Sequence, residues 1–174
     1  MADLRIYVAC LASYNNGKLH GAWIDLDGCP TKEDLMIEIL GMLDASPEPH
    51  AEEWAIHDSE GFGDWRHGEH PDLSDLVALA RLADEHGPIA VELMSHHCGD
   101  IGEVREALEE HYAGTGDSVE SWCEQFLDDT GQLNGMPESL RLYFDYEKYA
   151  RDLDLSGDIY TIECDGEVHV FWNH

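Results

Sequence analysis

The sequence of 174 residues predicts an α+β protein made of three small domains. Three observations support this fold class: a hairpin pattern opens the chain, helix patterns fill its middle, and a helix followed by a second hairpin closes it. Turn-rich polar stretches separate these parts. We therefore expect an α+β sheet domain at residues 1–61, a helical central domain at 62–103 and an α+β domain with a hairpin at 104–174.

Strand patterns dominate the first expected domain. Residues 4–10 and 19–26 are rich in β-branched and aromatic side chains, and Asn16 and Gly17 between them are typical turn residues. Residues 53–58 form a third, shorter strand pattern. These segments predict a hairpin and a third strand, which make a small α+β unit together with one helix.

Helix boundaries are marked by capping residues and by proline or glycine. Thr31, with Asp34 three residues later, is typical of a helix start, and Pro47 ends that helix. Asp72 likewise begins a helix that ends at Gly87. The first of these helices is expected to bury an apolar face of Leu35, Ile39, Leu40 and Leu43.

Further helix patterns at 89–98 and 101–112 make the middle of the chain helical, and turn-rich residues 113–117 follow. A helix that starts at Val119 then has two distinct faces. Its apolar face contains Val119, Trp122, Cys123 and Phe126. Its opposite face contains only acids, Glu120, Glu124 and Asp128, and is predicted to be a purely negative surface.

The segment 137–172 carries the clearest helix and hairpin patterns. Pro137 suits a first helical residue, because a helix start does not use the amide hydrogen that proline lacks. One helix is predicted from Leu140 onward, with a buried face of Tyr143, Tyr146, Ala150 and Leu153. Charges of alternating sign occupy another face, at Glu138, Arg141, Asp145, Lys148 and Asp152. Beyond Gly157 the pattern predicts two strands joined by a type I′ turn at Asp165-Gly166.

The junction between this helix and the hairpin contains a partial calcium-loop motif. Asp152, Asp154, Ser156, Gly157 and Glu163 occupy positions 1, 3, 5, 6 and 12 of the EF-hand template. That template needs a second helix after its last ligand, whereas this chain is predicted to turn into a strand. A regulatory module that binds calcium through Asp152, Asp154, Ser156 and Glu163 is the alternative function.

Net charge is the most unusual property of the composition. The chain has 38 acidic and 9 basic residues and a formal net charge of −29, yet 43% of its residues are hydrophobic. A chain this hydrophobic folds, so its charge is expected to lie on the surface. Such a surface repels nucleic acid, anionic membranes and acidic substrates, and it favours basic protein partners. A surface adapted only to high salt is a further alternative.

Apart from the partial calcium loop, catalytic and metal-binding patterns are not found. The five cysteines contain no C-x-x-C pair, and neither His96-His97-Cys98 nor the set His57, His67 and His70 has metal-ligand spacing. No local pattern marks a nucleophile or a phosphate loop. We therefore expect no enzyme activity, no metal and no cofactor. A signal peptide pattern and a membrane span are also missing, which predicts a cytoplasmic protein.

The charge density invites comparison with DNA. Duplex DNA carries one negative charge per ~1.7 Å of axis, so a charge of −29 equals that of roughly 50 Å of duplex. Acids four residues apart on a helix are about 6 Å apart along its axis, close to two phosphate steps of ~3.4 Å on one strand. A groove that binds DNA is therefore expected to accept the acidic face of Glu120, Glu124 and Asp128.

Four separated segments resemble the ArdA family of antirestriction proteins. They are RIYVACLASYNNGKLHGAWIDL at 5–26, EEWAIHDSEGF at 52–62, LRLYFDYEKYARDL at 140–153 and GDIYTIECDGEVHVF at 157–171. The resemblance implies an elongated, dimeric DNA mimic, carried by plasmids, conjugative transposons or phage. Such a mimic acts in the bacterial cytoplasm, where it occupies the DNA groove of type I restriction-modification enzymes. It has no catalytic residues, and its three-part layout agrees with the three expected domains.

Two sets of residues are candidate contact sites. The acidic surface expected to bind the methyltransferase core of a type I enzyme comprises Glu103, Glu106, Glu109, Glu110, Asp117, Glu120, Glu124, Asp128 and Asp129. A symmetric dimer should avoid the most negative faces because like charges repel, which favours the charge-balanced helix and the closing hairpin. The expected dimer contacts are Leu140, Tyr143, Phe144 and Tyr146.

Overall fold

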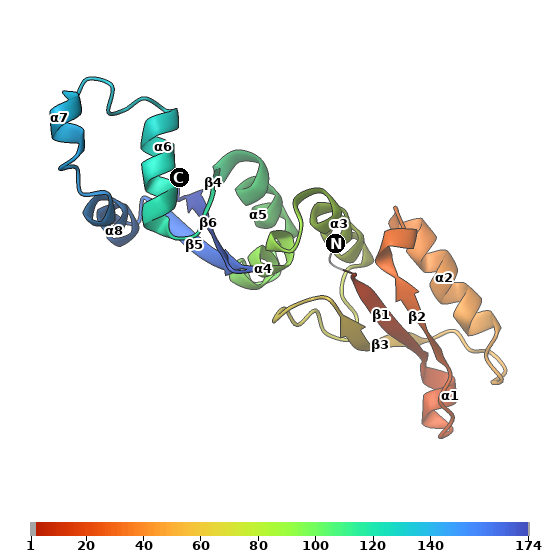
Figure 1. The fold of residues 1–174 in the computed structure, drawn as a ribbon. Helices are drawn as coiled ribbons and strands as arrows, with labels where there is room; N and C mark the ends of the chain where they lie inside the picture. The colour runs from red at the N-terminus through yellow and green to blue at the C-terminus, as the bar shows by residue number, and fades with distance from the viewer. Residues whose placement is uncertain (1–2, 174) are drawn as a thin grey trace. The chain divides into compact units, whose positions relative to one another are not determined.

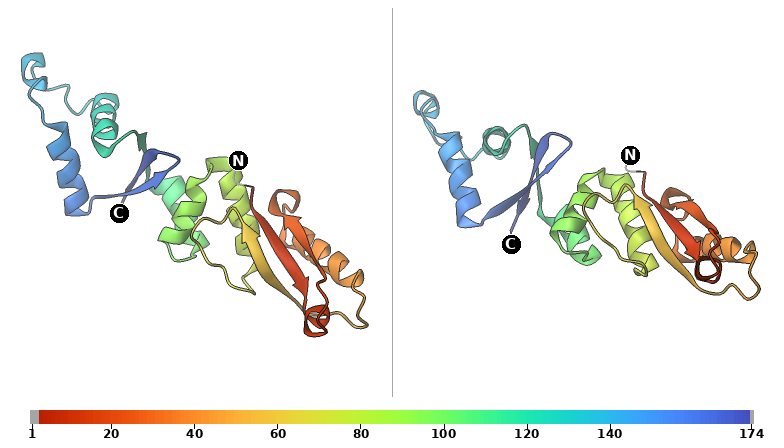
Figure 2. Two further views of the ribbon diagram at one scale, coloured as in Figure 1. Left: turned by 60° about the horizontal axis from the view of Figure 1, so that its bottom comes forward. Right: turned by 90° about the horizontal axis from the view of Figure 1, so that it is seen from below.

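The computed structural model describes residues 3–173, which divide into two compact units on either side of a boundary between Val104 and Arg105. Each unit contains one three-stranded antiparallel sheet together with several helices (Figures 1 and 2). The predicted α+β class is therefore confirmed. The arrangement in three domains is not confirmed, because residues 62–103 belong to the same compact unit as the first sheet.

The first sheet has the strand order β2-β1-β3, with β1 in the centre. Its strands are β1 (Arg5–Cys10), β2 (Gly21–Asp25) and β3 (Trp54–Glu60). Both pairings are antiparallel, so the predicted hairpin and third strand are confirmed. The connection between β1 and β2 also contains a short helix, α1 (Leu11–Asn15), and Gly17 adopts a φ of 73° that a glycine reaches without strain.

Helix α2 (Lys32–Asp44) follows a short 3₁₀ helix, η1 (Leu26–Gly28). Its start was predicted correctly: the hydroxyl of Thr31 accepts from the amide of Asp34, whose carboxylate accepts from the amide of Thr31. Leu40 was predicted to be buried, but 51% of it is exposed. Leu40 lies five residues after Leu35, which rotates it about 140° away on the helix. The buried face consists of Leu35, Ile39, Met42 and Leu43.

Three further helices follow: α3 (Leu73–His86), α4 (Ile89–His96) and α5 (Ile101–Glu106), of which α5 contains the boundary between the two units after Val104. Asp72 caps α3 by accepting from the amide of Ser74 at 2.8 Å, as predicted. The helix predicted for 101–112 is only partly right. From Ala107 to His111 the chain forms a π-helical turn, η2, and Tyr112 already begins a strand.

The second sheet has the strand order β4-β6-β5, in which β6 (Glu167–Trp172) pairs antiparallel with β4 (Tyr112–Gly116) and β5 (Ile159–Cys164). Positive φ angles at Asp165 and Gly166 confirm the predicted type I′ turn between β5 and β6. The turn-rich interpretation of residues 113–117 was wrong, because most of them form β4. Pairing with β6 holds this strand although Ala113, Gly114 and Gly116 have little strand propensity.

The helices of the second unit are α6 (Val119–Asp129), α7 (Glu138–Arg141) and α8 (Tyr146–Ser156). The single helix predicted from Leu140 to Leu153 was wrong, since the chain is not helical between α7 and α8. Asp145 provides the physical reason: its carboxylate accepts from the amide of Lys148 at 2.9 Å and starts a new helix there.

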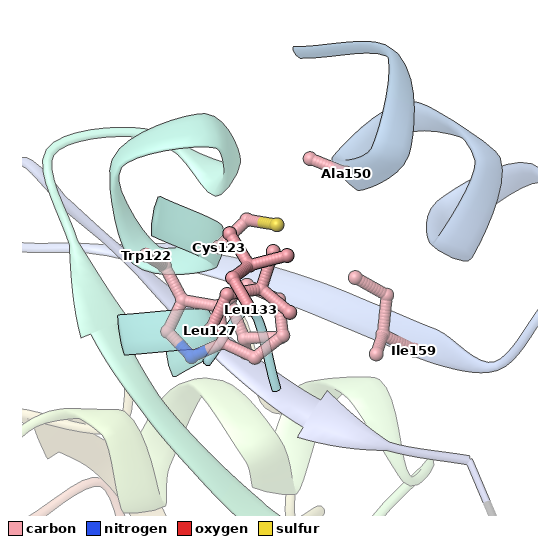
Figure 3. Packing of buried hydrophobic residues seen from close by; sticks show 7 residues of the cluster. Trp122, Cys123, Leu127, Leu133, Ala150 and Ile159 are labelled. Carbon is pink, nitrogen blue, oxygen red and sulfur yellow. The ribbon is translucent and has the colours of Figure 1, made fainter. Parts of the chain in front are cut away.

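One hydrophobic cluster holds the second unit together (Figure 3). Helices α6 and α8, the turn at Leu133 and the sheet contribute to it, and Figure 3 shows the ring of Trp122 beside Leu127 and Leu133. The buried members are Trp122, Cys123, Leu127, Leu133, Ala150, Ile159 and Val170. Helix α6 contributes three of these seven residues, so the packing of its inner face fixes the position of its outer face.

On the second sheet, His169 of β6 faces Tyr112 of β4, and the Nδ1 of His169 lies 3.1 Å from the hydroxyl of Tyr112. Burial lowers the pKa of His169 below the ordinary value of 6.5, against a weaker opposite effect of Glu167 and Asp165. The folded protein therefore takes up this proton less readily than the unfolded chain does. As pH falls below about 6.5, protonation of the unfolded chain therefore lowers the free energy of unfolding.

We predict that His169→Gln, which can still form a hydrogen bond with Tyr112, reduces this loss of stability in acid. The free energy of unfolding, measured by urea denaturation at pH 7.5 and pH 5.0, should fall more in the wild-type protein than in the variant. An equal fall in both proteins would contradict the prediction.

Candidate functional site

The acidic residues form the most extensive surface feature. None of the 38 carboxylates is buried: 34 are exposed, and only Asp34, Glu48, Asp75 and Glu92 are partly covered. Within residues 3–173, lysine and arginine form four ion pairs, and all four lie in the first unit: Arg5–Glu60, Lys18–Glu48, Lys32–Asp72 and Arg81–Glu85. Most carboxylates of the described chain therefore have no cationic partner.

Helix α6 presents a regular row of acids, as predicted. Glu120, Glu124 and Asp128 are all exposed, and a separation of four residues places successive carboxylates about 6 Å apart along the helix axis. Over the described part of the second unit, residues 105–173, no lysine or arginine forms an ion pair. The carboxylates of this row therefore have no direct lysine or arginine partner.

Several contacts fix α6 on the sheet. Ser118 and Ser121 form a reciprocal capping box at its start, with hydrogen bonds of 3.0 and 3.1 Å. The indole Nε1 of Trp122 donates to the carbonyl of Ala113 in β4 at 3.0 Å. Its ring stacks on Phe126 with a centroid distance of 5.2 Å and meets Trp172 of β6 edge-on. The acidic row therefore stands on a rigid, well-packed base.

The sequence of α6 is poorly suited to helix stability alone. Like charges four residues apart destabilise a helix by about 0.2 to 0.5 kcal/mol per pair. Asp128 and Asp129 lie in the last turn, where the helix dipole favours cations, and no basic residue is present there. Helices α2 and α8 also end without a basic residue. Helix stability therefore does not explain why the acids lie at these positions. Their placement is explained if the helices present negative charge on the protein surface.

All nine acids of the predicted contact surface are exposed. Glu103 belongs to the first unit and the other eight belong to the second. Glu106 has a nearby base, since the Nε2 of His111 lies 3.5 Å from its carboxylate. Exposure is thus confirmed for the whole set, while contact with a partner stays a prediction.

Sequence reasoning missed one concave part of the acidic surface. Asp117, from the connection between β4 and α6, lines a hollow of about 430 Å³ together with Glu163, Asp165 and Glu167 of the β5–β6 hairpin. The sequence predicts the turn at Asp165-Gly166. It does not show that Asp117, which follows β4, lies beside this turn. This proximity is a consequence of the strand order β4-β6-β5.

The four predicted dimer residues separate into two pairs. Leu140 and Tyr143 are 55% and 84% exposed, and the neighbouring Leu142, which the prediction omitted, is 86% exposed. Phe144 and Tyr146 instead pack partly buried against the hydrophobic cluster, with their rings 4.9 Å apart. Only the first pair is free to contact another molecule through most of its surface.

The calcium alternative is unsupported. Asp152, Asp154 and Ser156 lie in α8 rather than in a loop, and Glu163 lies in β5. The hydroxyl of Ser156 donates to the carbonyl of Leu153 and to the carboxylate of Asp158. Among residues 3–173, no group of three or more histidine, cysteine, aspartate and glutamate side chains is arranged to hold a metal ion.

Fold and surface together define a small, strongly acidic α+β protein whose second unit displays a row of carboxylates without lysine or arginine partners on a helix packed against a sheet. The sequence profile described as Antirestriction protein (ArdA) matches residues 6–166, which is most of the chain. The chain therefore belongs to the ArdA antirestriction family. No curated protein matches it.

Membership in this family implies an antirestriction function and an interaction with restriction enzymes. ArdA is an antirestriction family and not a known family of enzymes. In the part of the chain that the structure describes, no helix combines the length and apolar character needed to cross a membrane.

We predict that Asp128→Lys stabilises the protein while it interrupts the acidic row. The substitution replaces a repulsion between residues 124 and 128 by an attraction, and it places a cation at the end of α6. Together these changes should raise the free energy of unfolding by about 0.5 to 1 kcal/mol. Urea denaturation at low salt measures this, and Asp128→Asn should give a smaller gain. A loss of stability in both variants would contradict the prediction.

Proposed function

We propose that the protein is a DNA mimic, which occupies the DNA-binding groove of the methyltransferase core of a type I restriction-modification enzyme. In this position it blocks restriction and modification by competing with DNA. The observation that supports the proposal best is the row of exposed carboxylates on α6 without a lysine or arginine partner. A groove that binds phosphates by lysine and arginine side chains offers the complementary charges.

The spacing of the acids supports the same conclusion. Successive carboxylates on α6 are separated by about 6 Å along the helix axis, and phosphates two steps apart on one DNA strand are separated by a similar distance of about 7 Å along the duplex axis. The hollow lined by Asp117, Glu163, Asp165 and Glu167 adds negative charge on a second part of the same unit.

Since this charge repels phosphate and anionic lipid, neither nucleic acid nor a membrane is expected as a partner. The site of action is then the cytoplasm of a bacterial host, where restriction enzymes meet DNA.

Competition with DNA tests this proposal directly. Inhibition should also weaken gradually as negative charges are removed from the protein. The protein should displace a labelled duplex from a purified type I methyltransferase, and both inhibition and binding should weaken steeply as salt rises. Equally strong inhibition of an enzyme that already holds saturating DNA would contradict competition.

Neutralising acids one by one tests mimicry in the same assay. Single exposed charges contribute little, about 0.2 to 1 kcal/mol each, so each single variant should leave inhibition nearly intact and combinations should weaken it progressively. The series consists of Glu106→Gln, Glu110→Gln, Glu120→Gln, Glu124→Gln and Asp128→Asn. Its matched control exchanges Glu for Asp and Asp for Glu at the same five positions, which keeps the charge and should keep the inhibition. Abrupt loss of inhibition in one folded single variant would show a discrete site instead.

We further propose that the protein is a homodimer and that the exposed apolar residues of α7 and the following turn contribute to its interface. Leu140, Leu142 and Tyr143 form an apolar group on a surface that is otherwise dominated by acids. An interface should include such a group and avoid the acidic row, because like charges repel across a two-fold axis.

The double substitution Leu140→Glu and Tyr143→Glu should therefore convert the dimer to a monomer. Sedimentation velocity at micromolar concentration and moderate salt measures the change, and Leu155→Glu on the exposed side of α8 is the matched control. If the wild-type protein sediments as a monomer, the dimer is excluded under these conditions.

A further inference from the structure

A hollow of about 510 Å³ lies in the first unit, separate from the acidic row. One side is formed by η1 and the two residues after it, and the other by one face of α3. The lining residues are Leu26, Asp27, Cys29, Pro30, Val77, Ala80, Arg81 and Asp84. Val77, Ala80, Arg81 and Asp84 follow each other at intervals of three, one and three residues, so they share one face of α3.

The hollow has an apolar floor and a charged rim. Leu26, Cys29, Val77 and Ala80 are buried, with exposed fractions of 1 to 8%. Burial raises the pKa of the Cys29 thiol, and the nearby carboxylate Glu38 raises it further, so this side chain is a neutral part of the floor. The volume falls within the range of about 300 to 1,000 Å³ that ligand sites occupy.

The rim favours a positively charged occupant. Asp27 and Asp84 are exposed, and within residues 3–173 neither of them forms an ion pair. The one cation of the lining, Arg81, donates its Nε to the carboxylate of Glu85 at 3.2 Å. Two rim carboxylates are therefore left to pair with charges supplied from outside.

We propose that this hollow binds a peptide segment of a protein partner, in which a leucine-sized apolar side chain is followed by an arginine or lysine. The apolar side chain contacts Leu26, Val77 and Ala80, and the cation pairs with Asp27 and Asp84. An anchor side chain in a pocket is the typical centre of a protein interface. Such binding differs from DNA mimicry, because it depends on one shaped site and on apolar contact rather than on a summed negative field.

The proposal is tested with three dipeptides on the full-length protein, followed by ¹H–¹⁵N nuclear magnetic resonance. Acetyl-Leu-Arg-amide should shift the amide signals of residues 26–30 and 77–84 in a saturable manner. Acetyl-Ala-Arg-amide lacks the apolar anchor and acetyl-Leu-Gln-amide lacks the cation. Each should bind at least about tenfold more weakly, because burial of the leucine side chain and pairing of the charge both contribute to affinity. Equal affinity of all three peptides, or shifts spread over all acidic surfaces, would overturn the proposal.

Two pairs of variants separate the hollow from general charge attraction. Ala80→Leu fills the floor and should abolish saturable binding of acetyl-Leu-Arg-amide, whereas Ala78→Leu, two residues away on the same helix and outside the lining, should not. The rim variant Asp27→Asn with Asp84→Asn should weaken binding at least about fivefold, while Asp44→Asn with Glu52→Gln removes the same charge elsewhere and should change it little.

If the two charge-matched double variants weaken binding equally, or if Ala80→Leu binds as the wild-type protein does, the hollow is not the site. The rim variants leave the floor intact, so the result does not depend on whether Ala80→Leu folds. Because the probes contain no restriction enzyme and no DNA, the outcome is independent of the competition assay.

Discussion

Mutual repulsion among surface carboxylates is the constraint that the rest of the structure has to overcome. With a net charge of −29 and only four ion pairs that involve lysine or arginine in residues 3–173, the folded state gains little from charge attraction. Stability must therefore come from burial of apolar side chains. The 43% hydrophobic content and the packed cluster around Trp122 meet this requirement in the second unit.

The connection between core and surface is most direct in α6. Trp122, Cys123 and Leu127 fix the helix on the sheet, and the same turns of helix hold Glu120, Glu124 and Asp128 outward. Burial also raises the pKa of Cys123, with a smaller contribution from Glu120, so the thiol behaves as a neutral core group. A flexible acidic segment would carry the same charge but would lose conformational entropy when a groove ordered it.

Elements whose signals are local were predictable from the sequence. The Thr31–Asp34 capping box, the Asp165-Gly166 turn and the two faces of α6 each depend on residues within one or two turns. Strand β4 was not predictable, because its glycines and alanine carry little pattern and its pairing with β6 joins residues more than 50 positions apart. The break between α7 and α8 was missed for another reason: Asp145 fits the charge pattern of a continuous helix, although its side chain caps a new one.

Exposure of the acids on α6 followed from helix periodicity, whereas the concave cluster with Asp117 required the sheet order. The absence of lysine and arginine ion pairs over residues 105–173 has a further consequence. A surface with such dense charge gathers an atmosphere of cations from the solvent, as a nucleic acid does. Under the proposed mechanism, binding releases these cations from the protein and anions from the enzyme groove. The resemblance to DNA then extends from the arrangement of charges to the solution entropy that drives the association.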